Sequence, residues 1–153
     1  MQIKDIMSNE FTGVTPDTKI IDAINFMHDD YHSCTLVTDG EKLFGIFTER
    51  DVVRLQANFF TNQSNVDYFS STIDEVMTDT PIFVNEDSDI IEVIVIARNN
   101  GIRHFPVLDS EDKLVGLVTQ TDIMTAYTKL IKKLSSLEAN NHELQALALE
   151  DPL

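Results

Sequence analysis

Residues 45–51 read Gly-Ile-Phe-Thr-Glu-Arg-Asp, and residues 116–122 repeat the pattern as Gly-Leu-Val-Thr-Gln-Thr-Asp. Each stretch predicts a buried strand that opens on glycine and ends on threonine, followed by a helix with an aspartate in its first turn. At such a corner, free backbone N–H groups and a carboxylate meet at one edge of the strand. That edge suits the binding of a ribose or a phosphate.

The two stretches belong to a longer internal repeat. A shift of 70 positions aligns residues of the same kind along the chain: Met7 with Met77, Val14 with Val84, Asp17 with Asp87, and Val37 with Val107. One extra residue in the second copy then aligns the two glycine-threonine-aspartate ends. The chain is therefore predicted to contain two copies of one unit.

These motifs together resemble a tandem pair of CBS domains, from about Ile3 to Tyr127. The resemblance depends on DIMS at 5–8 and EVMT at 75–78, on VTPD at 14–17 and VNED at 84–87, on the doubled corner motif, and on GIRHFPV at 101–107. It implies an α+β fold of two β-α-β-β-α repeats, whose small mixed sheets pack about a pseudo-twofold axis. The expected division is a first repeat at 1–58, a linker at 59–72, a second repeat at 73–128 and a C-terminal helix at 129–153.

Composition limits the partners of this chain. Its 153 residues are 42% hydrophobic, enough for one compact domain or a pair of small ones. The net charge of -15 argues against nucleic acid or an anionic membrane surface, and favours an adenosine ligand of low charge over a polyphosphate. Cys34 is the only cysteine, and no signal peptide or membrane-length apolar run is recognisable, so we expect a cytoplasmic protein.

Hydrophobic periodicity predicts the elements of each copy. In the first copy we expect a helix capped by Thr18, a hairpin of strands at 34–38 and 42–47, and a helix from Arg50. In the second copy we expect Ser88 to cap a helix at 90–97 that is apolar on nearly every side. A single small sheet cannot cover such a helix, so the other copy is expected to pack against it. Aromatic residues are expected to anchor the linker: Phe59, Phe60, Tyr68 and Phe69.

The C-terminal segment follows the heptad spacing of a coiled coil. Apolar residues and one asparagine alternate in steps of four and three: Ile123, Tyr127, Leu130, Leu134, Leu137, Asn141, Leu144 and Ala148. This spacing predicts that the helix pairs with its own copy in a homodimer. Residues 146–153 resemble the entry to a GGDEF diguanylate cyclase domain, which implies that the full-length protein continues into an attached output domain of that kind.

The family resemblance also implies a set of ligand-binding residues. Asp51 and Asp122 are expected to hydrogen-bond the hydroxyls of a ribose, with Thr48 and Thr119 beside them. The remaining expected contacts line the cleft or approach a phosphate: Ile82, Arg50, Arg103, His104 and Phe105. The alternative interpretation makes each aspartate a first-turn carboxylate that stabilises its helix by under about 1 kcal/mol. It makes each threonine an N-cap, Arg103 a solvated side chain and His104 a half-buried one, both with surface hydrogen bonds.

The two clefts are expected to differ chemically. Thr121 replaces Arg50 in the second copy, and Leu36 replaces Pro106 in the first. The cleft nearer the family pattern is the one expected to hold the second-copy residues: Arg103, His104, Phe105, Thr119 and Asp122. We therefore expect one good site rather than two equivalent ones.

Other side chains do not form a catalytic or metal-binding pattern. His28 and His32 flank two aspartates at a helix end, where their side chains do not converge as a metal site requires. No Ser/His/Asp nucleophile signature, glycine-rich phosphate loop or paired acid/base motif is recognisable. The chain is therefore expected to be a regulatory sensor for an adenosine ligand such as AMP, ADP, ATP or S-adenosylmethionine, and not an enzyme. The alternative function is a ligand-free dimerisation scaffold.

Overall fold

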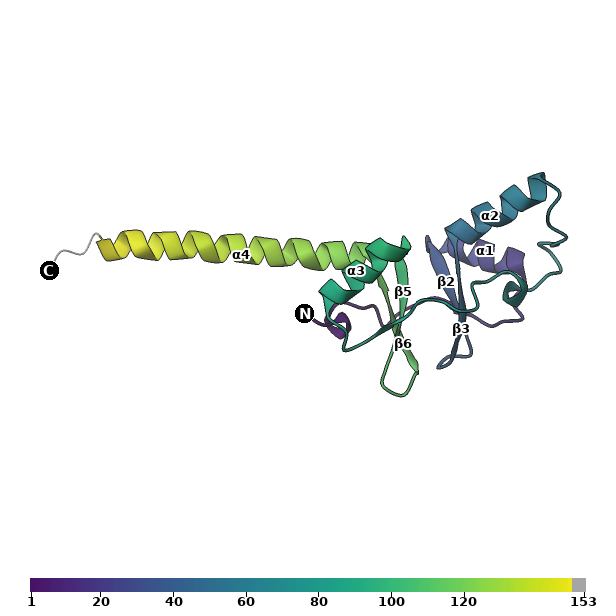
Figure 1. Ribbon diagram of the computed structural model, residues 1–153, viewed down its shortest axis with the longest axis horizontal. Helices are drawn as coiled ribbons and strands as arrows, with labels where there is room; N and C mark the ends of the chain where they lie inside the picture. The colour runs from purple at the N-terminus through teal and green to yellow at the C-terminus, as the bar shows by residue number, and fades with distance from the viewer. Residues whose placement is uncertain (150–153) are drawn as a thin grey trace.

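The computed structural model describes residues 1–149 and contains the repeated element order (Figure 1). The first repeat comprises β1 (Gly13–Val14), α1 (Ile20–Asp29), β2 (Cys34–Thr38), β3 (Leu43–Thr48) and α2 (Glu49–Phe60). The second comprises β4 (Val84–Asn85), α3 (Ile90–Asn100), β5 (His104–Leu108), β6 (Leu114–Thr119) and α4 (Gln120–Leu149). Short 3-10 helices precede them, η1 (Ile3–Asp5) and η2 (Ile73–Glu75). The predicted α+β class is confirmed.

Each repeat forms its own three-stranded mixed sheet. The strand orders are β1-β2-β3 and β4-β5-β6, with the first pair parallel and the second antiparallel in each sheet. The antiparallel register sets Cys34 opposite Thr48 and His104 opposite Thr119. Each hairpin therefore brings the start of its first strand beside the threonine at the strand-to-helix corner.

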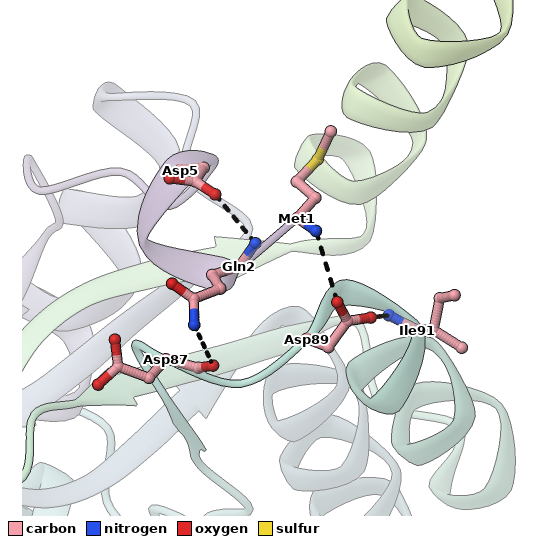
Figure 2. A network of polar contacts seen from close by, with 6 residues as sticks. All are labelled: Met1, Gln2, Asp5, Asp87, Asp89 and Ile91. Atoms are coloured by element: carbon pink, nitrogen blue, oxygen red, sulfur yellow. Dashed lines mark hydrogen bonds and ion pairs between the residues drawn. The ribbon is translucent and has the colours of Figure 1, made fainter.

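The segment before each repeat packs on the other repeat. Ile3 is fully buried in the core of the second repeat, and Lys4 N donates to Glu86 O at 2.9 Å. Figure 2 shows the polar contacts of this segment, including Gln2 Nε2 donating to Asp87 O at 3.1 Å. Conversely, Ile73 is fully buried in the core of the first repeat. The two packing units thus exchange their opening segments.

The glycines of the two corner motifs permit this exchange. A Cβ on Gly45 would lie 2.6 Å from Thr78 O, and a Cβ on Gly116 would lie 2.9 Å from Ser8 O. In both places the incoming segment bridges to the strand, through Ile46 with Thr78 and through Leu117 with Ser8. Only a residue without a side chain allows the two backbones to approach so closely.

The two repeats meet through their sheets. A buried cluster combines residues of both copies: Cys34, Leu36, Ile46, Leu108 and Leu114. A backbone hydrogen bond from Leu114 N to Glu41 O, 2.7 Å long, joins the two hairpins. The expectation that the first copy covers α3 was wrong, because Ile91 is 68% exposed and Val95 is 51% exposed.

Two local expectations are also corrected. The N-caps are one residue later than expected: Lys19 precedes α1, and Asp89 precedes α3 with its carboxylate accepting from Ile91 N at 2.9 Å. The expected aromatic anchors of the linker are mostly exposed: Phe59, Phe60 and Phe69. Of that set, Tyr68 packs against the first core, as Val66 of the linker also does.

The last helix leaves the body of the molecule (Figure 1). Ile123 and Ala126 are its buried residues, whereas positions 127–149 are exposed. Within the described residues, no helix combines the length and the apolar character needed to cross a membrane.

Candidate functional site

A hollow of about 380 Å³ lies between the repeats, and we call it the inter-repeat hollow. The β3–α2 corner, the start of β5, the β6–α4 corner and the segment before β4 supply its walls. Seven predicted site residues line it: Thr48, Arg50, Asp51, Ile82, Arg103, His104 and Thr119. Its volume is within the range typical of small-molecule sites.

Two predicted site residues lie outside this hollow. Phe105 is fully buried in the second core, because successive strand residues point to opposite faces and His104 takes the face toward the hollow. Asp122 lines a different hollow, between η1 and α4, together with Ile6 and Lys129. The structure therefore groups Arg103 and His104 with Asp51 of the first repeat, and not with Asp122.

Both corner aspartates cap their own helices. Asp51 Oδ2 accepts from Thr48 N at 2.9 Å, and Asp122 Oδ2 accepts from Thr119 N at 2.8 Å. In the second corner, Thr119 Oγ1 also donates to Asp122 Oδ2 at 2.7 Å, and Asp122 N donates back to Thr119 Oγ1 at 3.2 Å. These reciprocal bonds form capping boxes that satisfy helix N–H groups. The corner motif thus has a structural task whether or not a ligand is bound.

The surroundings of the two aspartates differ. Arg54 donates to Asp51 Oδ1 at 3.1 Å and also to Val76 O at 3.1 Å. The position that corresponds to Arg54 in the second repeat is Thr125, which offers no positive charge. Asp51 is 8% exposed and held in a fixed orientation at the wall of the inter-repeat hollow.

His104 joins the two repeats across the hollow. Its Nε2 lies 2.6 Å from Ser33 Oγ, a side chain of the first repeat. Burial lowers the pKa of His104, Arg103 lowers it further, and Glu49 opposes the shift. The imidazole is therefore favoured in its neutral form, which can both donate and accept a hydrogen bond.

The rim of the hollow is suited to an anionic or hydroxyl-rich group. Arg103 is exposed there, and Arg50 donates to Gly101 O at 3.3 Å. The N-termini of α2 and α4 both open on it, and a helix N-terminus carries a partial positive charge. Ile46, Pro81 and Ile102 add apolar wall suited to a planar ring.

Several lining residues were not among the expected contacts. Ser33, Thr78 and Pro81 reach the hollow because the exchanged segments and the packing of the repeats bring them there. Position within the repeat was the available signal, since Ser33 corresponds to Arg103 in the second copy.

The described residues contain no group of three or more His, Cys, Asp or Glu side chains placed to hold a metal ion. Cys34 lies buried in the cluster between the sheets, and burial raises the pKa of its thiol to about 12. This thiol is therefore unreactive at neutral pH, as expected of a core residue.

Comparison with known proteins yields a consistent set of similarities. The profile of the CBS domain matches residues 3–58 and 73–129. The uncharacterised protein YlbB of Bacillus subtilis is 32% identical over 124 residues, covering 80% of this chain and 79% of YlbB.

Solved structures show the same fold. The CBS domain pair of protein MJ0100, in complex with 5′-methylthioadenosine and S-adenosyl-L-methionine, is 26% identical with a TM-score of 0.70, covering 84% of this chain and 97% of that chain. CBSX2 in complex with AMP has a TM-score of 0.74 at 20% identity, covering 84% of this chain and 97% of that chain. At 20% identity, the similarity to CBSX2 shows a shared fold alone.

Proposed function

This chain belongs to the CBS domain family, and from that premise we propose that it is a regulatory module that binds an adenosine-containing ligand in the inter-repeat hollow. The family membership makes it a regulatory domain pair and not an enzyme. The observation that carries the proposal is the grouping of Asp51, Thr48 and Arg103 around one hollow that both repeats build.

The proposed contacts follow from the chemistry of each group. The Asp51 carboxylate is fixed by Thr48 and Arg54 and can accept hydrogen bonds from ribose hydroxyls. Arg103 and Arg50 stand at the rim, where a phosphate or a ligand carboxylate would be paired. Ile82 and Ile102 offer apolar contact to an adenine ring.

The charge of the chain narrows the ligand class. A net charge of -15 disfavours a polyphosphate unless a cation accompanies it. The MJ0100 pair was solved with two adenosine compounds that carry no phosphate, 5′-methylthioadenosine and S-adenosyl-L-methionine. We therefore rank these compounds and AMP above ADP and ATP as ligands of this chain.

Occupancy of the hollow would act directly on α4. Thr119, Gln120 and Thr121 line the hollow, and α4 begins at Gln120. A ligand that contacts this corner changes the equilibrium position of α4 only if it prefers one packing of the repeats. We therefore propose that the bound ligand favours one packing of the two repeats and thereby shifts the position of α4.

Isothermal titration with 5′-methylthioadenosine, S-adenosylmethionine, AMP, ADP and ATP tests the proposal. Arg103→Gln should weaken the binding of AMP or S-adenosylmethionine by roughly 10- to 150-fold, because it removes a charge-assisted contact to a phosphate or carboxylate worth roughly 1.5–3 kcal/mol. Binding of 5′-methylthioadenosine, which has neither group, should change little. Asp51→Asn should weaken ligand binding as well, while keeping an oxygen that accepts the Thr48 N–H. Saturation at 100 times Kd should add about 2.7 kcal/mol to the free energy of unfolding.

Arg98→Gln on α3 is the matched control, since it removes the same charge from an exposed residue outside the lining of the hollow. Affinity should be unchanged in this variant. Absence of heat with all five compounds would overturn the adenosine proposal. Loss of binding in Asp122→Asn, with Asp51→Asn unaffected, would move the site to the hollow beside α4.

The proposed target of the signal is an output domain that follows α4. The resemblance of residues 146–153 to the entry of a GGDEF diguanylate cyclase domain suggests which kind, although residues 150–153 lie outside the described part of the chain. Determining the coding sequence beyond Leu153 tests this, and a continuation without a GGDEF motif would contradict it.

A second candidate function is a dimerisation scaffold that binds no ligand. The exposed apolar residues along α4 favour it. It predicts a dimer whose melting temperature is the same with and without each of the five compounds, whereas ligand binding should raise it by several degrees.

A further inference from the structure

The projecting part of α4 exposes a row of large apolar side chains. Leu134 is 52% exposed, Leu137 is 53% exposed and Leu144 is 64% exposed. Helices gain most of their stability in water from packing an apolar face, and contiguous apolar surface of this kind marks an interaction site. We therefore expect another helix to pack against this row and cover its apolar side chains.

The spacing of the row assigns every other position on the helix. Tyr127, Leu134, Asn141 and Ala148 take the a positions, and Leu130, Leu137 and Leu144 take the d positions. It follows that Lys133 is at a g position and Glu138 is at an e position. In a parallel pair, a g residue faces the e residue five positions further along the other helix.

The charges on α4 suit one orientation only. In a parallel pair in register, Lys133 faces the partner's Glu138, and the pair occurs twice by symmetry. In an antiparallel pair, g positions face g positions and e positions face e positions. The g residues are Ala126, Lys133, Asn140 and Leu147, and the e residues are Met124, Ile131, Glu138 and Gln145. No antiparallel register therefore sets Lys133 against an acid or Glu138 against a base.

Asn141 supports the same orientation. In a parallel pair in register, the two Asn141 side chains face each other at an a position and can hydrogen-bond. In an antiparallel pair, a positions face d positions, so the amide would meet a leucine and lose its partner. Polar matching and charge matching therefore agree.

We propose that α4 pairs with α4 of a second copy in a parallel, in-register coiled coil, in which Lys133 of each chain faces the partner's Glu138. This pairing does not depend on ligand binding, and it fixes both inter-repeat hollows at the same end of a dimer. The C-terminal ends of the two α4 helices would then lie side by side.

Charge reversal tests the pairing in the 153-residue chain without nucleotide, by sedimentation equilibrium. Lys133→Glu should weaken dimerisation by roughly tenfold, because two attractive pairs become repulsive. Adding Glu138→Lys should restore it. Lys132→Glu is the matched control, since it makes the same charge change at an outward f position and should leave the dimer unchanged. A monomeric wild-type chain, or no rescue in the double variant, would overturn the proposal.

Cysteine cross-linking tests the orientation. Leu130→Cys and Leu144→Cys, made separately, should each give a disulfide-linked dimer on mild oxidation. Wild-type chain with its buried Cys34 should give none. An antiparallel pair can bring at most one of the two positions against itself, so cross-linking at only one or neither would exclude a parallel pair in register.

Discussion

The residues at the two strand-to-helix corners show how one motif supports two tasks. Thr48 with Asp51, and Thr119 with Asp122, close capping boxes that start α2 and α4. Only Asp51 also faces the inter-repeat hollow. The alternatives considered from sequence, a cap or a ligand contact, are therefore compatible at Asp51, because a carboxylate has two oxygens and several acceptor sites.

At the residue scale, His104 should make the fold sensitive to acid. Burial and Arg103 lower its pKa, whereas the unfolded chain takes up a proton near its usual value of about 6.5. The unfolded state thus binds more protons below that pH, and stability falls as pH falls through this window. Between pH 7.5 and 5.5, wild type should lose more stability than His104→Gln in urea titrations. An identical loss in both proteins would contradict the assignment.

At the element scale, local pattern was sufficient for most strands and helices. The β2–β3 hairpin lies within one residue of the strands predicted at 34–38 and 42–47, and α1 buries Ile20 and Met27 at helical spacing. The exchange of η1 and η2 could not be predicted, since Ile3 and Ile73 have the same local signal whichever core receives them. The grouping of the predicted site residues around one hollow could be foreseen only in part, because packing and not local pattern decides which repeat faces Arg103.

At Gly45, strand β3 and the segment that follows η2 approach each other closely. Gly45→Ala should destabilise the chain by about 1–3 kcal/mol, because the new Cβ would lie 2.6 Å from Thr78 O and force β3 away from the crossing segment. Gly116→Ala should act similarly through Ser8 O. Urea unfolding of both variants measures the effect. Wild-type stability in either variant would contradict the prediction, because the crossing segment would then move aside without loss of stability.

At the scale of the whole molecule, neither repeat is complete alone. The first core contains Ile73 and Val76 from the segment before the second repeat, and the second core contains Ile3 from the start of the chain. The inter-repeat hollow is likewise built from both copies. The candidate site can therefore assemble only when both repeats are folded and packed together.

Ile3→Ala tests this dependence. Its side chain is fully buried, so the loss should cost about 2–5 kcal/mol. Hydrogen exchange should show that protection falls first in β5 and β6, far along the sequence. Ile91→Ala, at a residue 68% exposed, is the matched control and should change stability by less than about 0.5 kcal/mol. Loss of protection confined to β2 and β3 would contradict the exchanged packing.

The exchanged opening segments also bear on the origin of the chain. A chain with one repeat would have no second core to receive its first residues, so two such chains could each bury the opening segment of the other. Gene duplication and fusion of two such chains would convert a segment exchange between two molecules into the internal symmetry of one.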